Sequence, residues 1–264
     1  MSSNHAGFRG ASVAFLFAFS FFFIAAVFLP IAASAVPVPG QGSWETTLQP
    51  RDLTGDDIPD AYYDTVLDVT WLADANLGAS EDFGVSEVTS SGRMTWEVAH
   101  AWIAAMNAAG YLGFSDWRLP TMTDIGGDGC NFAYSGTDCG YNVLTTDESV
   151  VYSELASLFY DTLGNLAAYD SDGNERTDTG PFNTGPFLNL HEGLYWFGLA
   201  DAMRDDYAWR FGFGNGKQDT RHKDRIRHAW AVRSGDVAVV PLPGAAWLLG
   251  TGLVAFAGFV RRRC

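Results

Sequence analysis

Residues 116–121 read Asp-Trp-Arg-Leu-Pro-Thr, a short segment with two large apolar side chains and a proline near its end. We expect Trp117 and Leu119 to lie in the core, because large apolar side chains are usually buried. Arg118 carries five N–H donors in one plane and is expected to bond nearby carbonyls or a carboxylate. Pro120 changes the chain direction. The segment is therefore predicted to be structural.

A helix is predicted just before this segment, over residues 96–109. Thr95 is a suitable N-cap and Gly110 can end the helix. The apolar side chains recur with helical spacing and share one face: Ala99, Trp102, Ile103 and Met106. A second helix is predicted over about residues 153–163, with Gly164 after its end.

The remaining apolar patterns indicate strands. Residues 61–71 alternate between apolar and polar side chains, as a half-buried strand or hairpin does. Later strands are predicted at residues 195–197 and 229–232, and at the alternating aromatics Tyr207, Trp209, Phe211 and Phe213. Residues 214–217, Gly-Asn-Gly-Lys, predict a hairpin turn.

Two helices followed by an aromatic-rich antiparallel sheet with long loops are typical of an α+β domain. No βαβ alternation and no internal repeat is evident. We therefore expect a single folded domain over residues 55–236, preceded by a Pro/Gly-rich lead-in segment at residues 36–54.

The composition excludes two broad classes. The 264 residues are 47% hydrophobic and 14% aromatic, which excludes a wholly disordered chain. The formal net charge of −15 argues against a general nucleic-acid binder, which needs a basic surface to displace phosphate counterions.

The N-terminus predicts export. An apolar run over residues 11–33 follows Arg9, and Ala-Ser-Ala at 33–35 resembles a signal-peptidase site. Residues 1–35 are predicted to be a cleaved signal peptide. The alternative is a retained membrane anchor, since the run is long enough to span a bilayer.

The C-terminus, residues 240–264, has three parts. Val240, Pro241, Leu242 and Pro243 precede an uncharged apolar stretch at 245–260, and three arginines and Cys264 follow. This order resembles the PEP-CTERM sorting signal of Gram-negative bacteria, in a V-P-L-P variant. The resemblance implies transient anchoring of a transmembrane helix in the inner membrane and processing by an exosortase. The alternative is a plain C-terminal anchor.

Removal of both ends leaves 12 basic against 31 acidic residues, a net charge of about −19.

Cys130 and Cys139 lie in one Gly-rich stretch and are expected to form a disulfide, since an exported chain meets an oxidising compartment. A metal-binding pair and a catalytic thiol are the alternatives. Neither has a supporting His or Cys nearby in sequence.

No common catalytic motif is present: the chain lacks G-x-S-x-G, H-E-x-x-H, a P-loop and G-x-G-x-x-G. We predict no catalytic residue, no confident metal site and no cofactor. The acidic loop 52–60 resembles a calcium-binding loop, with Asp52, Asp56 and Asp60 as candidate ligands. It departs from that pattern at Thr54 and at Asp57, and the alternative is a solvated acidic turn.

Residues 204–233 hold eight basic residues against four acidic ones. One interpretation is charge balance with acidic loops of the same domain. The other is a contact site for a polyanion such as an exopolysaccharide, formed by Arg221, Lys223, Arg225 and Arg227.

The chain also resembles the DUF1566 family, also called the Lcl C-terminal domain. The resemblance rests on the 116–121 signature and on later matches in the same order: Asp64 with Thr70-Trp71, Tyr195-Trp196, Ala208-Trp209, Gly214 and Trp230-Ala231-Val232-Arg233. It covers about residues 61–235. Thr123-Asp124-Ile125 and Phe197-Gly198 depart from the family pattern, and Trp230-Ala231 replaces a Cys-containing strand.

This resemblance implies a C-type-lectin-like fold and no established enzymatic activity. With both terminal signals, it implies a non-enzymatic protein of the cell surface or extracellular matrix that binds an exopolysaccharide or a surface protein in biofilm or adhesion. The alternatives are a structural matrix component without a ligand pocket and a glycan-acting enzyme.

Overall fold

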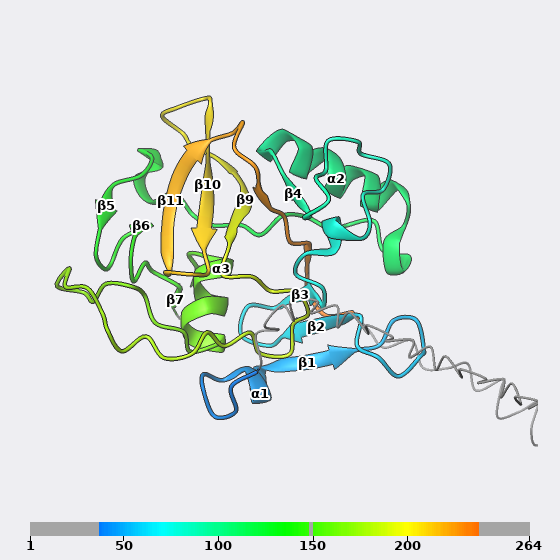
Figure 1. Ribbon diagram of the computed structural model, residues 1–264, viewed down its shortest axis with the longest axis horizontal. Coiled ribbons are helices and arrows are strands. Elements are labelled where there is room, and N and C mark those ends of the chain that lie inside the picture. Colours follow the sequence, from blue (N-terminus) through cyan, green and yellow to red (C-terminus); the bar gives the residue numbers. More distant parts are fainter. Residues whose placement is uncertain (1–36, 148–149, 238–264) are drawn as a thin grey trace, which may run out of the picture. The chain divides into compact units, whose positions relative to one another are not determined.

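The computed structural model describes residues 37–147 and 150–237, which form a mixed α+β fold (Figure 1). The largest sheet has seven strands. Their order is β4 (Arg93–Met94), β12 (Arg227–His228), β9 (Leu194–Ala200), β10 (Tyr207–Gly212), β11 (Lys217–His222), β6 (Cys139–Gly140) and β5 (Phe132–Ala133). The central strands β9, β10 and β11 are antiparallel neighbours, and the pairing of β10 with β11 confirms the hairpin predicted from residues 214–217.

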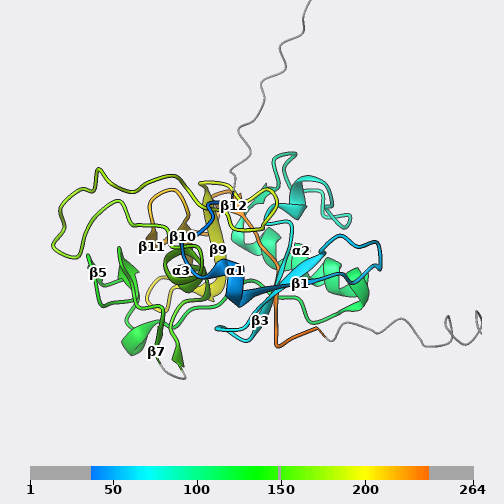
Figure 2. The same cartoon turned by 90° about the horizontal axis from the view of Figure 1, so that it is seen from below.

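A second sheet has four strands, in the order β1 (Leu48–Arg51), β2 (Ala61–Asp64), β3 (Val69–Leu72) and β13 (Val232–Ser234). The segment assigned to the lead-in contributes to this sheet, because α1 (Trp44–Thr47) leads directly into β1. Ser43 N donates to Thr162 O at 2.9 Å, and Figure 2 shows α1 beside α3. The smallest sheet pairs β7 (Thr146–Asp147) with β8 (Val150–Val151).

Helix α2 (Trp96–Ala108) confirms the first predicted helix. The Thr95 side chain caps it by accepting from Val98 N, and Gly110 follows the helix at φ +63°. The four predicted apolar side chains on its inner face are all buried. A 3-10 turn at Tyr111–Gly113 then leads to the 116–121 segment, and other 3-10 turns lie at Leu77–Ala79 and Ile125–Gly127.

The second helix differs in form from the prediction. It is one α-helical turn, α3 (Glu154–Ser157), followed by a wider π-helical segment, η4 (Leu158–Thr162). Ser153 caps the start by accepting from Ala156 N. At the end, Leu163 N donates to Leu158 O, five residues earlier, which is the spacing of a π-turn.

Two details of the predicted strands are wrong. The closing strand begins at Val232 and pairs with β3 in the four-stranded sheet, where its backbone also meets Arg118. The alternation in residues 61–71 does not place Asp64 in solvent. Asp64 is fully buried and accepts hydrogen bonds from Val66 N, Leu67 N and Trp71 Nε1, and burial raises the pKa of its carboxyl group.

The core is rich in tryptophan. Six tryptophan side chains are almost fully buried, and they include every Trp assigned to the core from sequence: Trp71, Trp102, Trp117, Trp196, Trp209 and Trp230. The indole N–H of Trp117 donates to Tyr111 O, that of Trp196 to Met94 O and that of Trp230 to Leu72 O. These hydrogen bonds offset the cost of burying polar indole nitrogens.

The 116–121 segment joins elements that are distant in the chain. Arg118 forms two hydrogen bonds to the Glu154 carboxylate, at 2.8 and 2.7 Å, and Thr121 N donates to the same carboxylate at 2.7 Å. The Arg118 backbone exchanges two hydrogen bonds with Val232 of β13. Glu154 is therefore the carboxylate that the Arg118 guanidinium was expected to meet.

The same segment also contacts α2 and the large sheet. Asn107 of α2 bonds the Trp117 backbone through both atoms of its side-chain amide. Gly198 N of β9 donates to Pro120 O, and Asp116 pairs with Arg233 through two hydrogen bonds. One six-residue stretch thus connects α2, α3, β9 and β13.

Replacing Glu154 with alanine should lower the free energy of unfolding by about 2 kcal/mol, because Thr121 N and the partly exposed Arg118 guanidinium then lose a buried carboxylate partner. The matched control is Asp178→Ala, which removes an exposed carboxylate 3.6 Å from Arg176 and should cost less than about 0.5 kcal/mol. Urea denaturation measures both. Equal midpoints for the two variants would contradict the role assigned to Glu154.

Candidate anion-binding face

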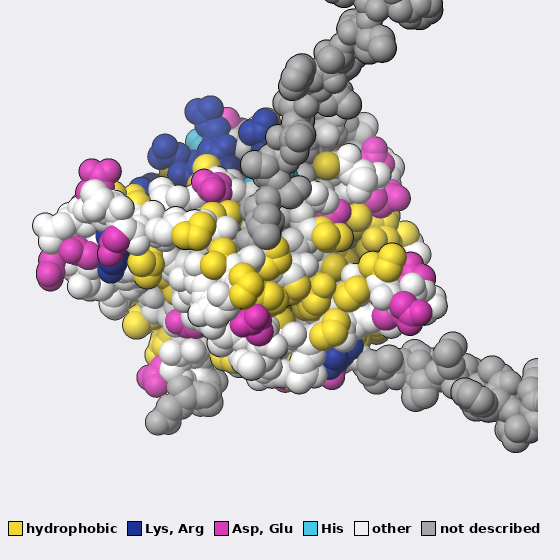
Figure 3. Space-filling view, turned by 60° about the horizontal axis from the view of Figure 1, so that its bottom comes forward, with side chains coloured by type: hydrophobic (Ala, Val, Ile, Leu, Met, Phe, Trp, Pro, Cys, Tyr) yellow, Lys and Arg dark blue, Asp and Glu magenta, His cyan; other side chains and the backbone are white. Residues whose placement is uncertain are grey.

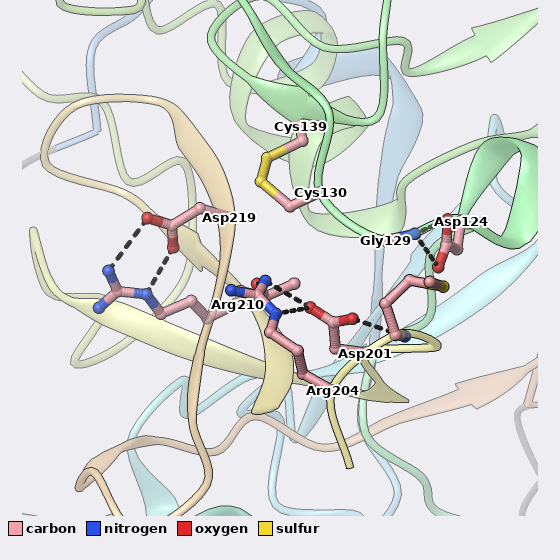
Figure 4. Close-up of polar contacts among 10 residues, drawn as sticks. Asp124, Gly129, Cys130, Cys139, Asp201, Arg204, Arg210 and Asp219 are labelled. Carbon is pink, nitrogen blue, oxygen red and sulfur yellow. Dashed lines mark hydrogen bonds and ion pairs between the residues drawn. A yellow bond between two sulfur atoms is a disulfide. The ribbon is translucent and has the colours of Figure 1, made fainter. Parts of the chain in front are cut away.

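The basic residues of segment 204–233 divide into paired and unpaired groups. Arg210 bonds Asp219 through two nitrogens at 2.6 and 3.2 Å, and Arg204 bonds Asp201 at 2.6 Å. Figure 4 shows both guanidinium groups pointing toward their carboxylates. Lys217 also lies 3.1 Å from Asp219. These pairs support the charge-balance interpretation for part of the segment.

The other group lies around Arg227, on β12. Neither Arg221 nor Arg227 has an ion pair within the described residues, and Arg225 meets only the exposed Asp224, at 3.6 Å. The Arg227 guanidinium is partly buried. Its Nε has no hydrogen-bond partner in the described part of the chain, and one of its other nitrogens donates to Ile226 O.

The electrostatic environment of Arg227 is unfavourable for a cation. Burial lowers the pKa of its guanidinium first, and the neighbouring charges of Arg210, Arg221 and Arg225 lower it further, while Asp219 opposes them. Arginine stays protonated in proteins, so burial of this guanidinium carries a desolvation cost, and the neighbouring arginines add repulsion to it. An anion bound here would remove that cost.

Strand geometry explains why these side chains meet. Side chains two apart on a strand share one face, so Lys217, Asp219 and Arg221 of β11 lie on one face of the large sheet. Arg210 is directly opposite Asp219 in the register and shares that face. We call the unpaired or weakly paired Arg221, Arg225 and Arg227 the cationic face; Arg210 is buried and, like Lys217, pairs with Asp219.

Figure 3 shows Lys and Arg side chains gathered mostly at one edge of the view, whereas Asp and Glu are spread over the rest of that view. The positive charge is thus concentrated on a chain whose net charge is −15. Such a concentration favours anionic partners through both attraction and association rate.

Lys223, the fourth residue predicted from sequence, does not join this group. Its ammonium lies over the Trp96 ring at 4.4 Å from the centroid and 3.9 Å from Glu97. It therefore belongs to the α2 surface. Sequence reasoning also missed Arg210 as a neighbour, because only the β10–β11 register brings it to the face.

The calcium candidates form a self-contained loop. Asp52 accepts backbone hydrogen bonds from Gly55, Asp56 and Asp57, which lower the pKa of its carboxyl group. Asp60 accepts from Leu53 N and Thr54 N. Within the described residues no group of three or more His, Cys, Asp or Glu side chains is arranged to hold a metal ion. Calcium binding here stays a prediction.

The predicted disulfide between Cys130 and Cys139 is present (Figure 4).

Both predicted terminal signals lie outside the described residues. These are the signal peptide at 1–35 and the sorting signal at 240–264, which includes Val240, Pro241, Leu242 and Pro243. In the described part of the chain, no helix combines the length and apolar character needed to span a bilayer.

Comparisons with protein-family models, with curated proteins and with solved structures found no match for this chain. The resemblance to the DUF1566 family therefore stays a prediction from the sequence.

His228 lies beside Arg227 on β12 but faces the core. Its ring stacks between those of Tyr195 and His191, at 5.0 and 5.2 Å, and its Nδ1 lies 2.9 Å from Asn76 Oδ1. Burial, with the nearby charges of His191 and Arg93, lowers the pKa of His228 to about 4. This histidine is therefore neutral in the folded protein at neutral pH.

This lowered pKa predicts loss of stability in acid. Between pH 6.5 and about 4 the unfolded chain binds a proton at His228 that the folded protein does not, so stability falls as pH falls through this window. The loss from pH 7 to pH 4 should be about 3 kcal/mol larger in the wild type than in His228→Asn. His222→Asn, at a more exposed histidine, serves as the control. Identical pH profiles of unfolding for the wild type and His228→Asn would refute the assignment.

Proposed function

We propose that this chain is a non-enzymatic, exported protein of the cell surface or extracellular matrix, whose lectin-like domain binds an acidic exopolysaccharide. The observation that carries the proposal is the cluster of Arg221, Arg225 and Arg227, in which a partly buried guanidinium lacks an anionic partner. The rest of the molecule pairs most of its arginines closely: Arg51 with Asp236, Arg118 with Glu154, Arg204 with Asp201, Arg210 with Asp219 and Arg233 with Asp116. An unpaired cluster beside such pairs favours an external ligand.

An acidic exopolysaccharide is a ligand that an exported protein, as the sequence predicts, would meet outside the cell. Both terminal signals predict export in a Gram-negative bacterium, where acidic exopolysaccharides surround the cell. The Cys130–Cys139 disulfide agrees with an oxidising compartment. Nucleic acid fits less well, because the chain as a whole is acidic.

The exopolysaccharide proposal predicts loss of binding when the cluster is removed. Arg225→Ala/Arg227→Ala should weaken binding to alginate, a polyuronate, at least about tenfold at low salt, because charge-assisted hydrogen bonds are lost. Wild-type binding should also fall as salt rises. Titration of labelled alginate measures both effects.

Lys223→Ala is the matched control, because it removes one nearby positive charge that lies on Trp96 and not in the cluster. It should change alginate affinity less than threefold, a roughly 0.6 kcal/mol effect. Undetectable binding of acidic glycans by the wild type at low salt would overturn the proposal and favour a structural matrix component.

The proposed export and sorting predict where the mature protein begins and that its C-terminal residues are removed. Mass spectrometry of the protein from its native organism should find an N-terminus near residue 36 and no peptide containing Cys264. Fractionation should place this form at the cell surface or in the matrix. A mature protein that retains Cys264 would contradict exosortase processing.

A further inference from the structure

Four aromatic side chains cluster at the β5 end of the large sheet: Phe132, Tyr134, Tyr141 and Tyr169. Phe132 meets the Tyr134 ring edge-on at 5.3 Å, and Tyr134 is parallel to Tyr141 at 6.0 Å. Two members remain open to solvent, since Phe132 is 50% exposed and Tyr134 is 36% exposed. We call this exposed pair the aromatic edge.

Hydrogen bonds, a disulfide and a close strand contact fix the position of the aromatic edge. The Asn142 side-chain amide donates to Tyr134 O at 2.8 Å and to Tyr169 O at 2.9 Å. Residue 132 pairs with Cys139, whose disulfide closes the loop. Gly140 has φ +115°, and a side chain there would collide with Ala133 O, so only glycine permits the close approach of β5 and β6. A rigid surface of this kind loses little entropy on binding.

Lys217 lies beside the aromatic edge. Its ammonium lies 5.3 Å from the centroid of the Phe132 ring and 3.1 Å from Asp219. Asp219 in turn bonds Arg210, and both of these residues are buried, so Lys217 is the member of this series that solvent reaches beside Phe132.

We propose that the aromatic edge is a subsite for the same acidic polysaccharide, where one of its sugar rings packs against Phe132 and Tyr134. This inference rests on the proposed function and narrows the ligand to a pyranose chain bearing carboxylates. The C–H faces of a pyranose are apolar and bury well against an aromatic ring. Lys217, whose side chain is partly exposed beside the Phe132 ring, supplies a cation for a sugar carboxylate.

The test separates a sugar from a general polyanion. Phe132→Ala/Tyr134→Ala in the full chain should weaken alginate binding about tenfold and leave binding of inorganic polyphosphate within about twofold. Arg225→Ala/Arg227→Ala should weaken both ligands. Ile58→Ala, which truncates another exposed apolar side chain outside this region, is the control and should change neither.

The outcomes distinguish this inference from the function on which it rests. Unchanged alginate binding by the aromatic variant overturns the stacking proposal, while the arginine result still supports polyanion binding. Equal loss of both ligands also overturns it, provided that near-ultraviolet circular dichroism shows a native fold. Phe132→Trp, which keeps an aromatic face, should retain alginate binding, and its failure to do so counts against stacking. If the arginine variant binds alginate as the wild type does, the proposed function itself fails.

Discussion

The ion pair between Arg118 and the buried Glu154 is the interaction on which the arrangement of the fold depends. Glu154 is 3% exposed, and its carboxylate receives two guanidinium hydrogen bonds and one from Thr121 N. Burial of this carboxylate is tolerated because these three hydrogen bonds, two of them from a cation, compensate for its lost hydration. The pair orients the start of α3 against the 116–121 segment, and the flanking residues connect that segment to α2, β9 and β13. A planar, bidentate donor is needed here, which lysine does not supply.

The other arginines show the same need for a carboxylate partner, and they differ in whether the fold provides one. Arg51, Arg210 and Arg233 each meet a carboxylate through two hydrogen bonds. Arg227 is partly buried without such a partner and is surrounded by other arginines. Folding satisfies the first set internally. Arg221 and Arg227 have no such carboxylate partner within the described residues, which is why we propose an anionic ligand for the cationic face.

Local sequence patterns predicted several elements of the fold correctly. The capping threonine, the spacing of four apolar residues and a glycine at positive φ predicted α2 to within one residue at its end. Alternating aromatics predicted β10 and its turn into β11. The candidate site was predicted less fully. Of its four residues named from sequence, Arg221, Arg225 and Arg227 lie near one another, but Lys223 lies on Trp96 and Arg210 joins from β10. Phe132 and Tyr134 carried no signal in sequence, because nothing local shows which aromatic side chains stay exposed.

The sequence by itself determined where α2 begins and ends, which of its side chains are buried, and which cysteines pair, because capping, periodicity and short-loop closure act between residues close in the chain. Tertiary structure alone decided that Glu154 meets Arg118, that β13 joins β3, and that Arg227 lies among other arginines. These contacts join residues that are far apart in the chain or depend on the register of neighbouring strands. A shift of one residue in that register would turn each side chain to the opposite face. The sequence therefore shows which residues are basic, but strand pairing decides whether each positive charge meets a carboxylate within the domain.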